Sequence, residues 1–225
     1  MKKVLLTALI TLTFFSASIA QLTSGQVSYE INISSDSDQG AQIASMMDGA
    51  TMKIYFDKSG TRTEFDMGFM MSMTTILNND TEEIVMLMGG MMGNKAIKSS
   101  VTEMKVEEDK GNEDLSIELK DEKKTIAGYK CKKAILKNKN GATDIIYWYT
   151  EDIEMNTTAQ NNINSLVPGF AMEYEVKSNG MNMKFTVSEV IKKLDKSPSE
   201  LFSTKVPDGY EEMSMDDLKK MGLGN

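Results

Sequence analysis

The chain contains no histidine and only one cysteine, Cys131. The lack of histidine excludes Ser-His-Asp and Cys-His catalytic arrangements and zinc sites built on histidine. A single cysteine excludes an intramolecular disulfide. Neighbouring lysines could lower the pKa of Cys131. However, Tyr129, Cys131 and Ile135 share one face of a predicted strand, so we expect a buried, unreactive thiol.

Acidic residues outnumber basic ones, and the formal net charge is −8 at pH 7. This balance argues against nucleic acid and anionic lipid surfaces as partners. The carboxylate pairs at 82–83 and 216–217 fall where solvated charges are expected. A calcium loop starting at Asp36 would place Met47 where a bidentate glutamate is needed. With no glycine-rich phosphate motif either, we expect a protein that is not an enzyme and that needs no cofactor.

The only long apolar run lies at the N-terminus. A lysine pair precedes the apolar stretch 4–15, and the small residues Ser18 and Ala20 follow it. This is the pattern of a cleaved signal peptide, residues 1–20, because the run is too short for a membrane-spanning helix. We expect an exported protein, periplasmic or extracellular, in which residues 21–225 form a single domain and a monomer.

Alternation of apolar and polar residues with a period of two dominates the rest of the chain. It is clear in VSYEINI at 27–33 and TMKIYFD at 51–57, and it returns at 115–119, 170–176 and 181–187. Such alternation predicts half-buried strands. Short turn sequences between the strands predict antiparallel neighbours, with one dry and one wet face. We therefore expect a mainly β (α+β) fold.

Helical signals are sparse. A short helix is predicted at 38–49, because Ile43, Met46 and Met47 would lie on one side of it. Further helices are predicted at 157–169 and 197–202, and a tail helix within 213–225, each after a capping residue. The charged segment VEEDKGNED at 106–114 predicts a mobile loop between two groups of strands. The helices are too few and too short to form a layer of their own, so we expect them to pack at a single sheet.

Methionine is the most unusual component, with 20 residues against 8 Phe and 7 Tyr. If 63–77 is extended, its odd positions form a nearly continuous apolar stripe. In EIVMLMG at 83–89 both faces are apolar, so we expect this strand to be covered on both sides. The candidates for an apolar ligand-binding face are Met52, Phe65, Met67, Phe69, Met71, Met73, Met86, Met88, Met172 and Met183.

Four explanations of the methionines stay open. They could fill an ordinary core, line an adaptable concave surface for a lipid, acyl chain or lipidated peptide, bind Cu(I), or scavenge oxidants. The candidate copper ligands are Met70, Met71, Met73, Met91 and Met92. Against copper, Met71 and Met73 are a full pleat repeat apart, and histidine, the commonest accessory ligand, is missing. The protein is then a binding protein for an apolar ligand, a Cu(I)-binding protein, or a structural envelope module.

Several segments resemble a known family. They are MKIYFDKSGTRTEF at 52–65, IAGYKCKKA at 126–134, IIYWYT at 145–150, PGFAMEYE at 168–175 and VPDGY at 206–210. In them the chain resembles exported Gram-negative envelope proteins that share a domain of unknown function, a family distantly similar to the LolA/LolB-like outer-membrane lipoprotein carriers. This resemblance implies a curved antiparallel sheet, an incomplete barrel whose concave apolar face is closed by short helices and holds acyl chains. It also implies a lipoprotein or another envelope protein as partner.

Arg62 lies in the segment GTRTEF. The resemblance implies a functional role, since the carriers have a functional arginine after the corresponding hairpin. The residues around it favour a surface ion pair with Glu64 or Asp66.

Overall fold

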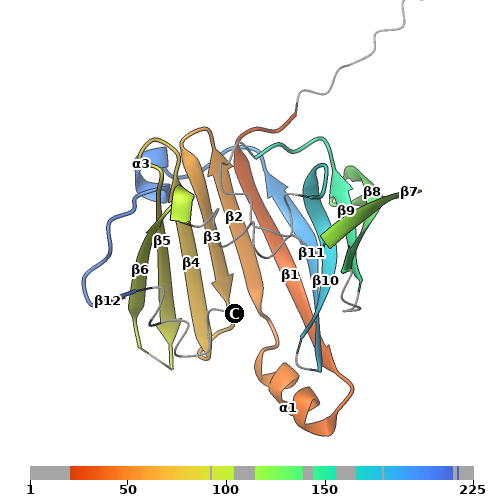
Figure 1. Ribbon diagram of the computed structural model, residues 1–225, viewed down its shortest axis with the longest axis horizontal. Helices are drawn as coiled ribbons and strands as arrows, with labels where there is room; N and C mark the ends of the chain where they lie inside the picture. The colour runs from red at the N-terminus through yellow and green to blue at the C-terminus, as the bar shows by residue number, and fades with distance from the viewer. Residues whose placement is uncertain are drawn as a thin grey trace, which may run out of the picture.

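Twelve strands form one sheet in the part of the chain that the structure describes. The structure is a computed structural model and describes residues 21–91, 93–103, 115–138, 144–155, 166–178, 180–214 and 217. The strand order is β12-β6-β5-β4-β3-β2-β1-β11-β10-β9-β8-β7 (Figure 1). All neighbours are antiparallel except β12 and β6, which are parallel.

The bounds of the elements follow the predicted alternation closely. The strands are β1 (Gly25–Ser35), β2 (Thr51–Asp57), β3 (Gly60–Asp66), β4 (Met71–Asn78), β5 (Glu83–Gly90), β6 (Lys95–Ser100), β7 (Leu115–Ile126), β8 (Tyr129–Asn138), β9 (Ile145–Thr150), β10 (Phe170–Ser178), β11 (Met181–Ile191) and β12 (Glu211–Met213). The helices are α1 (Asp38–Met46) and α3 (Pro198–Leu201). In β1 the apolar side chains of Val27, Tyr29 and Ile31 are buried, whereas Glu30 is exposed. The mainly β prediction is confirmed.

The sheet is strongly curved. The rings of Phe65 on β3 and Phe185 on β11 lie 6.4 Å apart between centroids, although β2 and β1 separate their strands. Three strand spacings along a flat sheet would amount to about 14 Å. The side chains therefore converge on a concave side, here called the inner face, and the opposite side is the outer face. The curved antiparallel sheet with few short helices is thus confirmed.

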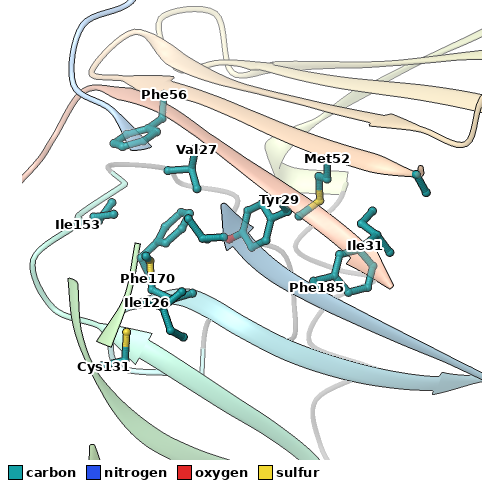
Figure 2. Packing of buried hydrophobic residues seen from close by; sticks show 13 residues of the cluster. Val27, Tyr29, Ile31, Met52, Phe56, Ile126, Cys131, Ile153, Phe170 and Phe185 are labelled. Atoms are coloured by element: carbon teal, nitrogen blue, oxygen red, sulfur yellow. The ribbon is translucent and has the colours of Figure 1, made fainter. Parts of the chain in front are cut away.

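The largest buried cluster fills the inner side of the central strands (Figure 2). It joins Val27, Tyr29 and Phe56 from the N-terminal strands to Phe170 and Phe185 from the C-terminal ones. The hydroxyl of Tyr29 crosses the interior and donates a hydrogen bond of 2.6 Å to the carbonyl oxygen of Ala171. The N-terminal strands β1 and β2 and the C-terminal strands β10 and β11 therefore share one core.

A second buried cluster lies on the outer face of β4, β5 and β6. Val85 and Leu87 of β5 are buried there beneath Leu201 and Phe202, which the segment around α3 provides. Gly60 is required here, since a Cβ at that position would lie 2.2 Å from the Leu77 carbonyl oxygen, besides 3.1 Å from Phe202. The outer face of β5 is covered, as its apolar sequence predicted.

The helices occupy other places than the resemblance implied. α1 lies beyond the end of β1 (Figure 1), and the segment bearing α3 packs on the outer face. The buried residue of α3 is Leu201, which belongs to the cluster on the outer face, so this helix does not close the inner face. None of the described helices is long and apolar enough to span a membrane.

Other predictions concern the ends and loops of the chain. The signal peptide at 1–20 and the loop at 106–114 lie outside the described residues, as does most of the helix predicted at 157–169. Of the tail predicted as a helix within 213–225, Met213 ends β12, which pairs with β6, and Asp217 is helical. Beyond β12 only Ser214 and Asp217 are described, and the Ser214 hydroxyl accepts a hydrogen bond from the Asp217 backbone N–H at 3.2 Å.

Candidate functional site

The strand register places several of the predicted binding residues side by side on the inner face. Met52 pairs with Phe65, Phe65 with Met73, and Met73 with Met88. Side chains directly opposite each other in antiparallel strands have Cβ atoms about 5 Å apart. The row Met52–Phe65–Met73–Met88 is therefore a continuous apolar band that runs across four strands.

The inner face has two zones that differ in burial. In the first zone, Met52 is 8% and Met172 is 0% exposed, and both belong to the large core cluster. Phe65, Met67 and Met183 are partly buried and pack against that cluster. These residues fill an interior, as the core explanation of the methionines predicts.

The second zone is only half buried and lies on β4 and β5. Its members share a face with the core but belong to none of the buried clusters found among the described residues. They are Met71, Met73, Met86 and Met88, with Thr75 opposite Met86. We call these four methionines the methionine face, together with Phe65, which lies opposite Met73 at the border with the first zone and is itself only partly buried. The thioether side chains of the four methionines are thus partly exposed.

The apolar stripe predicted along 63–77 is divided by a turn. Asp66 accepts a hydrogen bond from the Gly68 backbone N–H at 2.7 Å, and Gly68 has a φ of +65°. The Met67 N–H donates to the Met71 carbonyl oxygen at 2.9 Å and closes the β3–β4 hairpin. Phe69 lies in this turn and is 64% exposed. The structure therefore separates Phe69 from the other predicted binding residues.

The candidate copper ligands are split between the sheet and its end. Met70 and Met91 are neighbours in two turns, where the Met91 N–H donates to the Met70 carbonyl oxygen at 3.4 Å, and Met91 is 76% exposed. Met71 and Met73 lie on the methionine face, and Met92 is outside the described residues. Within the described ranges, no group of three or more His, Cys, Asp or Glu side chains could hold a metal ion.

Arg62 forms the ion pair and Cys131 is buried, as the neighbouring residues in the sequence predicted. The Arg62 Nε donates to Glu64 Oε1 at 2.7 Å on the outer face, which confirms the expected ion pair. Cys131 is 1% exposed, and its thiol donates to the Tyr129 carbonyl oxygen at 3.4 Å. Burial raises the pKa of the Cys131 thiol, so the reactive thiolate is disfavoured.

Sequence reasoning missed Lys95, the residue opposite Met88 in β6. It stands at the end of the row that starts at Met52, on the same face. In the sequence Lys95 follows a glycine-containing turn. A lysine at the start of a strand is ordinarily exposed to solvent, so nothing local marks it as part of a site. Only the pairing of β5 with β6 shows that it shares a face with the methionines.

Comparison with known families gives a result that the sequence resemblance did not. The family model described as "N-glycanase peptide, N-terminal domain" matches residues 70–217. The chain belongs to this family. The matched range begins at the β3–β4 turn and includes Met71, Met73, Met86 and Met88. No curated protein matches the chain.

Solved structures similar to this chain have low sequence identity to it. The structure of PNGF-II in a C2 crystal form has 14% identity and a TM-score of 0.49, and the match covers 88% of this chain and 32% of that one. The chain thus spans about a third of the length of PNGF-II. The lipoprotein LppX of Mycobacterium tuberculosis has 12% identity and a TM-score of 0.32, with coverage of 77% of this chain and 89% of that chain. A LolA-superfamily protein of Nitrosomonas europaea has 11% identity and a TM-score of 0.23, with coverage of 81% and 90%. The similarity to LolA-like proteins is therefore distant.

Proposed function

We propose that this domain is a non-catalytic, exported binding domain that holds an apolar ligand on the methionine face. The observation that carries the proposal is the half-buried state of Met71, Met73, Met86 and Met88 on one face beside a packed core. Covering such side chains with an apolar partner is favourable by about 25 cal/mol for each Å² removed from water. Methionine side chains are flexible and polarizable, so the face can adapt to ligands of different shape.

The residues of the chain support binding over catalysis. The sequence has no histidine, and the one cysteine is buried with a raised thiol pKa. The family description names the N-terminal domain of an N-glycanase, and the match to PNGF-II covers 32% of that chain. An accessory domain that binds a ligand is compatible with both facts.

The proposal is tested by titrating the protein with the neutral apolar dye Nile red and recording its fluorescence. Saturable binding is expected for the wild type. Met73→Ser combined with Met88→Ser should weaken binding at least about tenfold, because each substitution removes apolar contact area. Met46→Ser is the control, since Met46 is 53% exposed and belongs to α1, not to the strands that form the methionine face. Absence of saturable binding, or equal binding by the double variant, would overturn the proposal.

A second candidate, Cu(I) binding, is supported by one observation. Met73 and Met88 are directly opposite each other, and Met71 shares their face, so three thioethers lie within two strands. Soft thioether ligands suit Cu(I). Competition for Cu(I) with a chromogenic chelator tests this candidate, and no transfer of the metal to the protein would eliminate it.

A further inference from the structure

The two faces of strands β2 to β6 differ sharply in charge. On the inner face, the register positions of these strands are Met52, Ile54, Phe56, Thr61, Thr63, Phe65, Met71, Met73, Thr75, Leu77, Ile84, Met86, Met88, Gly90, Lys95, Ile97 and Ser99. The outer face of the same strands carries Lys53, Asp57, Arg62, Glu64, Asp66, Glu83 and Lys98. Lys95 is thus the single charged residue that these five strands place on the inner face.

Lys95 stands at the end of the methionine row. It is opposite Met88, which is opposite Met73, which is opposite Phe65. Three strand spacings separate Lys95 from Phe65, about 14 Å along the sheet. The row therefore presents one positive charge at one end and an apolar surface over the rest of its length.

The positive charge of Lys95 has a partner that is easily replaced. Its ammonium forms an ion pair with Glu211 of β12, and the Lys95 side chain is 24% exposed while that of Glu211 is 73% exposed. Glu211 belongs to a strand of three residues at the edge of the sheet. Exposed ion pairs contribute only about 0–1 kcal/mol. Another anion can therefore replace the Glu211 carboxylate at little cost.

We propose that the ligand of the methionine face is a single-chain amphiphile with an anionic head, in the class of long-chain carboxylates. Its carboxylate pairs with Lys95 in place of Glu211, and its chain lies over Met88, Met73 and Phe65. This inference rests on the proposed function and adds the charge and orientation of the ligand. A cationic head would face the same lysine and be repelled, and a neutral head would leave the ion pair with Glu211 in place.

The experiment compares laurate with dodecanol, which have the same chain length and differ in the charge of the head group. Displacement of Nile red at pH 8 and low salt measures both affinities. For the wild type we expect laurate to bind up to about fivefold more tightly than dodecanol, the range that an ion pair at a partly exposed site allows. The preference should shrink at high salt because ions screen the pair.

Matched variants locate the effect on Lys95. Lys95→Gln should remove the preference for laurate, so that this variant binds laurate and dodecanol with similar affinities. Lys98→Gln is the control, since Lys98 lies on the same strand, faces outward and pairs with Glu212 of the same β12 at 2.9 Å. Glu211→Gln should strengthen laurate binding, because it removes the competing carboxylate. Urea unfolding of each variant shows that the fold is retained.

The outcomes separate this inference from the proposed function. Equal affinities of the wild type for laurate and dodecanol, or an equal loss in Lys95→Gln and Lys98→Gln, overturn the role of Lys95 while apolar binding stands. Failure of both ligands to displace Nile red overturns the proposed function as well. A preference lost only in Lys95→Gln and strengthened in Glu211→Gln supports the inference.

Discussion

The hydroxyl of Tyr29 on β1 donates a 2.6 Å hydrogen bond to the carbonyl oxygen of Ala171 on β10. Both residues are buried, with exposures of 3%. Tyr29→Phe removes the donor and leaves a buried carbonyl without this partner, so we expect a loss of about 1–3 kcal/mol in the free energy of unfolding. Urea unfolding measures it. Tyr55→Phe is the control, because its hydroxyl bond to Glu64 is long, at 3.4 Å, and half exposed. An effect of the same size in both variants would contradict the prediction.

Alkaline pH should destabilise the protein through its buried tyrosines. Burial raises the pKa of Tyr29, Tyr147 and Tyr174 above the ordinary value of 10. Above pH 10 the unfolded chain loses these protons and the folded chain keeps them, so their contribution is full below pH 10 and decreases as the pH rises. Each tyrosine should steepen the loss of unfolding free energy by up to about 1.4 kcal/mol per pH unit.

A single substitution checks the contribution of one tyrosine. Tyr174→Phe should show a shallower decrease than the wild type between pH 10 and 11, measured by urea unfolding at each pH. Lysines titrate equally in both proteins and cancel in the comparison. Identical slopes would mean that Tyr174 ionises in the folded state.

Cys131 should be unreactive in the folded protein. It is 1% exposed, and burial raises the pKa of its thiol. A thiol-specific reagent is expected to label the native protein slowly and the urea-unfolded protein at once, because labelling requires an exposed thiolate. Rapid labelling without denaturant would contradict this expectation.

Phe202 should be important for stability although it lies outside the sheet. Its side chain is 1% exposed and belongs to the cluster on the outer face of β4, β5 and β6. Phe202→Ala should lower the free energy of unfolding by about 3–5 kcal/mol, the usual cost of truncating a buried phenylalanine. Leu119→Ala is the control, since Leu119 is 56% exposed on the edge strand β7 and should change stability by about 0.5 kcal/mol or less.

Arg62 should affect neither folding nor ligand binding strongly. It forms a partly exposed ion pair with Glu64 on the outer face, away from the methionines. We expect Arg62→Gln to cost at most about 1 kcal/mol in unfolding free energy and to leave Nile red binding unchanged. Weakened dye binding by this variant would restore the functional role that the resemblance to the carriers implied.

The sequence predicted the strands well because their physical signal is local. The alternation at 27–33 reappears as buried Val27, Tyr29 and Ile31, and the doubly apolar sequence at 83–89 is a strand whose outer face is covered. The split of the stripe at 63–77 was also accessible in principle. Asp66 and Gly68 carry a turn signal, but the run of methionines around them has the composition of a strand.

The composition of the site could not be predicted to the same degree. Which methionines are buried depends on the curvature of the sheet, and Met52 and Met73 have the same local pattern although only Met52 joins the core. The side of the sheet on which Lys95 lies depends on the register between β5 and β6. The outer face of β5 is covered by the segment around α3, which is more than 100 residues away in the sequence. These are tertiary relationships that no single segment encodes.

The pairing of β1 with β11 has a consequence for how the molecule is made. Gln26 lies opposite Ile191, so the middle of the sheet joins the first described strand to one of the last. A growing chain that has not yet reached β11 has β1 with an open edge and a core without Phe185. Completion of the fold therefore waits until β11 has been synthesised, and fragments that stop before β11 should be prone to aggregation.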